Sequence, residues 1–215
     1  MRNANRKGRA MPIFANRSAA MFRVCLAASL LGLGGCVSLG GAEPPESLLT
    51  LTPELAAPAG STLNVASSQT IALYEPTVPA EIDVLRVPVK ISGSSIAYLK
   101  DALWVERPAQ LFRRLLAETI RVRSERVVLP SGDPAARGGT QLRGHLDEFG
   151  YDASRAAVVV RYDATMLGEG GMVRQQRFEV SEEGVPPEAG AVGAALNRAA
   201  NDVARQVADW VQQAP

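Results

Sequence analysis

The clearest strand signal in the chain is the stretch AAVVVRYDATML, residues 156–167. From Val158 onward, apolar side chains occupy every second position, and Arg161, Asp163 and Thr165 lie between them. An alternation of period two is typical of a strand with one buried face. We therefore predict a strand here that directs one face into the core. The side chains expected on that face are Val158, Val160, Tyr162, Ala164 and Met166.

Neighbouring stretches extend this strand to an antiparallel meander. Residues 140–149 alternate with Leu142 and Leu146 on one face, and residues 150–154 have the composition of a turn. A second turn is predicted at Gly168-Glu169-Gly170-Gly171, ahead of a strand over 172–180. Further short strands are expected at 48–52, 70–74, 84–91, 96–99 and 127–129.

The strand predicted at 84–91 carries a proline. Its apolar set, Leu85, Val87, Val89 and Ile91, is expected to be buried. Because Pro88 has no N–H to donate, this strand is expected at a sheet edge or with a bulge.

Two amphipathic helices complete the predicted fold. The first begins at Pro108, whose missing N–H suits the first helical position, and the second covers residues 189–213. Apolar side chains recur in both at the spacing of one helix face. The predicted class is thus α+β, a single domain with a largely antiparallel sheet covered by the middle helix and the C-terminal helix. The expected buried stripes are Leu111, Phe112, Leu115, Leu116, Thr119 and Ile120, and Val192, Leu196, Ala199, Val203, Val207 and Trp210. On the second helix, Arg198, Asp202, Arg205 and Asp209 are expected to pair with one another.

The N-terminal sequence resembles a bacterial lipoprotein signal peptide. Its first 35 residues carry six basic side chains and no acidic one, and an apolar run leads into Leu33-Gly34-Gly35-Cys36, which matches a lipobox. The run Val24 to Leu33 is far shorter than the roughly 20 residues that a transmembrane helix needs.

This resemblance implies three segments: a signal peptide, 1–35, a lipidated cysteine with its tether, 36–46, and a folded domain, 47–215. Cys36 then carries the lipid anchor. Val37 and Ser38 follow it in place of an aspartate, which favours the periplasmic face of the outer membrane. Acyl chains bury about 0.8 kcal/mol per CH₂, so a multiply acylated cysteine anchors stably.

Charge and cysteine content narrow the function further. The chain has 23 basic and 22 acidic residues, but from Cys36 onward the balance is 17 against 22. A mildly acidic domain argues against nucleic acid as a partner. With Cys25 in the signal peptide and Cys36 lipidated, no cysteine is left for a disulfide.

Candidate catalytic groups are few. His145 is the one histidine and is expected to face solvent, so no set of His and Cys ligands can form a metal site. Asp147 and Glu148 are adjacent, and on a regular strand they point to opposite faces, so only a bulge could pair them. We find no nucleotide-binding or hydrolase motif. The sequence predicts a protein that is not an enzyme, needs no cofactor and acts through its surfaces.

Residues 98–108, Tyr-Leu-Lys-Asp-Ala-Leu-Trp-Val-Glu-Arg-Pro, with the helix after them, resemble the signature of the ABC-type transport auxiliary lipoproteins, the paraquat-inducible protein C-like family. The lipobox, the early and later strands and the C-terminal helix follow in similar order, so the resemblance covers nearly the whole chain after Cys36. Lys100 and Asp101 depart from it, because smaller residues are expected there.

The resemblance implies a docking or capping subunit of an ABC system that moves lipids between two membranes. Its partners would be a periplasmic MCE-domain protein with a separate permease and ATPase, and homo-oligomers are compatible with it. Tyr98 and Trp104 are the candidate partner-binding residues, with core packing as the favoured alternative for both. Two other functions stay open: an envelope scaffold or regulator of peptidoglycan synthesis or outer-membrane assembly, and a direct periplasmic lipid carrier.

Overall fold

The computed structural model describes residues 47–137 and 139–213. The predicted signal peptide, Cys36 and the tether lie outside these residues. The strands are β1 (Thr70–Leu73), β2 (Arg86–Ser92), β3 (Ser95–Leu103), β4 (Val127–Pro130), β5 (Thr140–Asp152), β6 (Ala157–Leu167) and β7 (Val173–Glu183). The helices are α2 (Pro108–Ser124) and α3 (Ala189–Gln212), with short 3-10 turns η1 (Ser67–Gln69), η2 (Pro134–Ala136) and η3 (Glu169–Gly171).

The strands of the described residues form one mixed sheet built around β5. On one side, β6 pairs antiparallel with β5 and β7 pairs antiparallel with β6, which confirms the predicted meander. On the other side, β1 pairs with the beginning of β5 and β2 with its end, both in parallel. β3 extends β2 antiparallel, and β4 extends β1 in parallel. The α+β class is confirmed, and the short parallel pairings make the sheet mixed.

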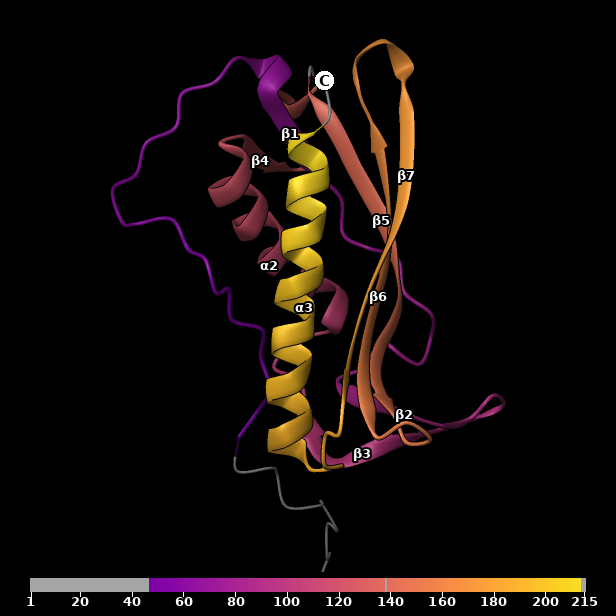
Figure 1. The fold of residues 1–215 in the computed structure, drawn as a ribbon. Coiled ribbons are helices and arrows are strands. Elements are labelled where there is room, and N and C mark those ends of the chain that lie inside the picture. The colour runs from indigo at the N-terminus through magenta and orange to yellow at the C-terminus, as the bar shows by residue number, and fades with distance from the viewer. Residues whose placement is uncertain (1–46, 138, 214–215) are drawn as a thin grey trace, which may run out of the picture. The chain divides into compact units, whose positions relative to one another are not determined.

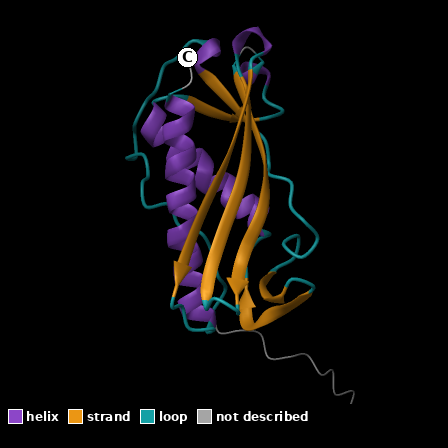
Figure 2. Cartoon of the chain, turned by 45° about the vertical axis from the view of Figure 1, so that its right-hand side comes forward, coloured by secondary structure: helices purple, strands orange, loops and turns teal. Residues whose placement is uncertain are grey.

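Both helices cover the same face of the sheet. α3 runs along the meander, and α2 packs beside α3, while among residues 47–137 and 139–213 no α-helix lies on the other face of the long strands (Figures 1 and 2). The five core-facing residues predicted on β6 are all buried, and so are the predicted stripes on α2 and α3. Pro108 is the first residue of α2, as predicted. None of the helices in the described part of the chain is long and apolar enough to span a membrane.

A tyrosine fills the centre of this core. The ring of Tyr162 lies 5.1 Å from the ring of Phe112 between centroids and passes directly over Gly144 on β5. A Cβ atom at Gly144 would lie 2.3 Å from both Cζ and the hydroxyl oxygen of Tyr162, so the close approach needs glycine. The hydroxyl is fully buried and has no hydrogen-bond partner among the described residues. Burial raises the pKa of the Tyr162 hydroxyl.

The segment ahead of β1 is bound to the helices. The buried amide of Asn201 donates hydrogen bonds to the carbonyl oxygens of Thr52 (3.0 Å) and Asn197 (2.8 Å) and accepts one from the N–H of Glu54 (2.9 Å). Further along, the Ala57 N–H donates to a carboxylate oxygen of Glu118 (2.8 Å). Residues 49–57 therefore form a strap, as we call this segment below, across α3 and α2.

Some predicted strand boundaries and partners were wrong. Residues 48–52 contain only a single bridge, from Leu49 to Trp104, because the strap continues toward the helices. β5 runs to Asp152, three residues into the predicted turn. β2 lies between β3 and β5 and is no edge strand, but its register shifts between Arg86 and Pro88, which confirms the predicted irregularity at the proline.

Two further expectations about side chains were also wrong. Leu85 and Ile91 are 47% and 49% exposed, whereas Val87 and Val89 are buried as predicted. Two of the four charges on α3 bind other elements: Arg198 pairs with Glu182 of β7, and Asp209 with Arg123 of α2. Within the described residues, Arg205 with Asp202 is the predicted pair that stays on the helix.

Candidate functional site

The β2–β3 hairpin projects from one end of the domain. It crosses the lower end of the molecule in Figure 1 and extends beyond the long strands. Residues 90–97 are all exposed, so both faces of the distal hairpin are uncovered. A strand pair without a covered face gains no burial energy of its own, which makes this hairpin a candidate contact surface.

Tyr98 lies in this hairpin and is half-buried. Its Cα partner on β2 is Pro88, and the guanidinium carbon of Arg86 lies 4.9 Å from the centre of its ring. An arginine at that distance is attracted by the negative face of the ring. The pair thus presents an aromatic ring and a cation together on the surface, the residue types that dominate binding energy at many protein interfaces.

Trp104 lies in the core. It is 1% exposed, and its ring centroid is 5.4 Å from that of Phe149. Its backbone holds two segments together, since its N–H donates to Leu85 (2.9 Å) and it bridges Leu49. A partner can therefore reach Tyr98 but not Trp104, and the two residues do not form one surface.

A cavity of about 540 Å³ lies between the hairpin and the end of β5. This volume is within the roughly 300–1,000 Å³ of small-molecule sites. Its wall is only partly apolar, because four carboxylates face a single lysine there, Lys90. The hydrocarbon tail of a lipid would meet unfavourable contacts with such a wall. The carboxylates are Glu81, Asp147, Glu148 and Asp152.

A charge cluster around Arg161 adjoins the cavity. The guanidinium donates to Glu179 (2.6 Å), Asp147 (3.1 Å) and Glu148 (2.9 Å). The hydrogen bond from Arg161 lowers the pKa of the Glu179 carboxyl, and the carboxylates around it raise the pKa of the guanidinium. With one cation shared by three anions, the cluster is a structural ion network.

The bulge that Asp147 and Glu148 need in order to lie together is present. The register of β5 shifts between Leu146 and Glu148, a bulge that lets both adjacent carboxylates reach the same guanidinium. Both carboxylates accept hydrogen bonds from Arg161, so the bulge makes Asp147 and Glu148 members of one charge cluster.

His145 lies on the face of the sheet away from the helices. Its Nδ1 is 2.9 Å from the Thr77 hydroxyl, and Nε2 is 3.8 Å from Asp147. The side chain is 42% exposed, in line with the predicted solvent-facing position. The described residues contain no group of three or more His, Cys, Asp or Glu side chains placed to hold a metal ion.

The exposed isoleucines of the hairpin are the surface feature that sequence reasoning missed. The alternation predicts a buried position for Ile91 and a strand position for Ile96, yet the two residues are 49% and 50% exposed. The available signal was the composition between them, Ser-Gly-Ser-Ser, because apolar residues beside a tight turn often lie beyond the covered part of a sheet.

Comparisons with known proteins agree with this architecture. The sequence profile of the family described as "ABC-type transport auxiliary lipoprotein component" matches residues 50–208. No curated protein matches the chain in sequence. A crystal structure of an uncharacterized protein is 14% identical, with a TM-score of 0.60 over 77% of this chain and 99% of that one. The crystal structure of protein XCC0632 from Xanthomonas campestris is 18% identical, with a TM-score of 0.61 over 77% and 95% of the two chains. At these identities the likeness shows the fold.

Proposed function

The chain belongs to the ABC-type transport auxiliary lipoprotein component family, and from this premise we propose that it is a docking subunit of an envelope transport system that moves lipids between two membranes. In this proposal Cys36 carries the lipid anchor at the periplasmic face of the outer membrane. An MCE-domain protein is the periplasmic partner, and the permease and ATPase are other chains. The family match over residues 50–208 is the observation that carries the proposal.

The site geometry supports a docking role. Tyr98 and Arg86 present an accessible aromatic and cationic pair for protein contact. Residues 37–46 span at most about 35 Å when extended, so the domain stays close to its membrane. A lipid conduit needs a continuous apolar path, and a tethered cap would hold its end against the acceptor bilayer.

The test is a crosslinked pull-down from detergent-solubilised envelopes with the C-terminally tagged chain. We expect co-purification of an MCE-domain protein with a permease and an ATPase, and loss of these proteins with Cys36→Ala. Recovery of a peptidoglycan synthase or an outer-membrane assembly factor in their place would contradict the proposal. A second, differently tagged copy in the same cells reports whether the chain also binds itself.

A matched pair of tyrosine variants tests the docking surface. Tyr74 resembles Tyr98 because it is half-buried and packs against a guanidinium, with the Arg143 guanidinium carbon 4.2 Å from its ring centre. It differs in position, because it directly follows β1 and lies outside the β2–β3 hairpin. We expect Tyr98→Ala to weaken partner recovery and Tyr74→Ala to leave it unchanged. Equal recovery with both variants would remove Tyr98 from the docking surface.

A further inference from the structure

Exposed apolar side chains gather where three backbone segments meet. The Trp104 N–H donates to Leu85 (2.9 Å) and the Val105 N–H to Leu49 (2.9 Å), so these segments are neighbours. Leu48, Leu85 and Val105 lie at this junction and are 51%, 47% and 48% exposed. Such large apolar side chains close together on a surface often mark a contact with another molecule or a membrane.

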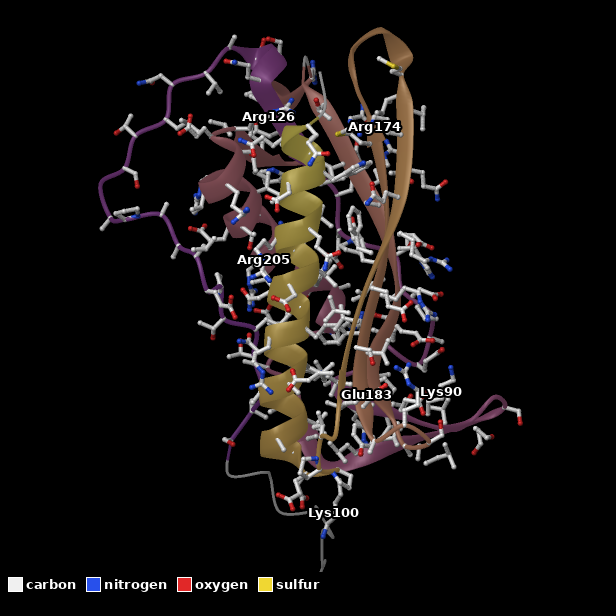
Figure 3. The ribbon with its side chains drawn as sticks, viewed as in Figure 1. Lys90, Lys100, Arg126, Arg174, Glu183 and Arg205 are labelled. Atoms are coloured by element: carbon white, nitrogen blue, oxygen red, sulfur yellow. The ribbon has the colours of Figure 1, made fainter. Side chains whose placement is uncertain are left out.

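The hairpin that leaves this junction adds two isoleucines and a basic charge. Ile91 and Ile96 lie beside its turn, on the stretch whose two faces are uncovered. Lys100 points outward at this end (Figure 3), whereas Lys90 pairs with Glu148 at the cavity (3.5 Å). From Arg86 to Leu103 the charge is +2. We call Leu48, Leu85, Ile91, Ile96 and Val105 the apolar end.

The described chain begins at the apolar end. Residue 47 directly precedes Leu48, and ten residues, 37–46, separate the domain from Cys36. A segment of that length spans at most about 35 Å even when fully extended. The β6–β7 turn, with Met172 and Val173 exposed, lies at the opposite end of the molecule (Figure 1).

We propose that the apolar end rests on the lipid bilayer to which the chain is anchored. The proposal depends on the lipid attachment at Cys36 put forward above. Ile91 and Ile96 enter the boundary between head groups and acyl chains, and Lys100 faces the anionic phosphates. Because the anchor already holds this end within tens of ångströms of the surface, a small apolar area suffices to orient the domain.

Single cysteines test this contact in the full-length lipoprotein. Once Cys25 has been removed and Cys36 acylated, Ile96→Cys or Met172→Cys supplies the one free thiol for an environment-sensitive fluorophore. The labelled proteins are reconstituted in vesicles of phosphatidylethanolamine and phosphatidylglycerol with a nitroxide on the acyl chains. We expect several-fold stronger quenching and a blue-shifted emission at position 96, and neither at position 172. Adding Ile91→Ser to the Ile96→Cys protein should reduce the quenching.

Mass spectrometry of each preparation reports the acylation of Cys36 separately. An acylated protein whose two labels are quenched equally would overturn the membrane contact and leave the docking function standing. Protection of the Ile96 label that appears only when envelope proteins are added would also overturn it, because the hairpin would then bind a protein. A chain that is not acylated would overturn the anchor together with the contact.

Discussion

Replacing Tyr162 with phenylalanine should stabilise the domain. The hydroxyl is fully buried in the core against Phe112 and has no partner among the described residues. A buried hydroxyl without a hydrogen bond costs about 1–3 kcal/mol in proteins. Phenylalanine keeps the ring and its contacts and removes only the oxygen, so we expect a gain of about 1 kcal/mol in the free energy of unfolding at pH 7.

The same substitution should change the response to alkali. Burial raises the pKa of Tyr162 in the folded state, while a tyrosine in the unfolded chain ionises near pH 10. Above pH 10 the unfolded state therefore binds fewer protons, and stability falls by about 1.4 kcal/mol per pH unit for this group. Below pH 10 the tyrosine keeps its proton in both states, so its ionisation no longer makes stability depend on pH. The phenylalanine variant should lack this loss.

Urea unfolding at pH 7 and at pH 10.5 to 11 measures both effects on the two proteins. For a domain of this size, 1 kcal/mol corresponds to roughly 2–4 °C in Tm, so thermal unfolding gives a second readout. The reasoning would be refuted by a variant that is less stable at pH 7, since the hydroxyl would then have a partner such as a bound water. An unchanged alkaline dependence would show that Tyr162 reaches solvent before unfolding.

Three other substitutions test the packing and the charge cluster. Gly144→Ala places a Cβ against the Tyr162 ring and should lower the free energy of unfolding, measured in urea, by about 1–3 kcal/mol. In a Tyr162→Val background most of that cost should disappear. If Gly144→Ala alone were neutral, the Tyr162 ring would have to move freely. Arg161→Gln removes the group that lowers the pKa of Glu179. In the parent, this ion pair stabilises the fold above the ordinary glutamate pKa, near 4.3, and the stabilisation is lost as pH falls through the lowered value. The variant should lack this pH-dependent stabilisation, and an equal pH dependence in variant and parent between pH 7 and pH 3 would contradict the prediction. Ala156→Gly relieves a residue at φ 48°, a conformation that favours glycine. It should raise the free energy of unfolding by up to about 1 kcal/mol, and Tm should rise with it. A lower Tm would show that the entropy of glycine outweighs the strain.

Periodic stretches of sequence predicted their own structure. In β6 apolar residues recur at every second position, and in α2 and α3 they recur at the spacing of one helix face. Every residue predicted to be buried in these three elements is buried. Local periodicity suffices there because one large partner surface covers the whole length of each element.

β2 shows where such reasoning ends. Val87 and Val89 are covered, but Leu85 and Ile91, in the same alternation, extend past the sheet that covers their neighbours. Alternation reports that two faces differ and carries no information on how far the covering layer extends. Asp147 and Glu148 make the same point for the charge cluster, because the bulge that unites them on Arg161 depends on the pairing with β6.

The strap determines how an anchor at Cys36 would act on the domain. Asn201 binds both Thr52 and Glu54, and it is 4% exposed with its amide groups fully used, so the chain is fixed to α3 within a few residues of Leu48. Ten residues, 37–46, would separate such an anchor from the domain, and the described chain begins at the end that carries the β2–β3 hairpin. An anchor at that point brings the hairpin to the bilayer first and leaves the length of the meander to extend away from it. If both proposals hold, a docking partner that reaches Tyr98 would approach close to the membrane surface, as the end of a conduit between two membranes would.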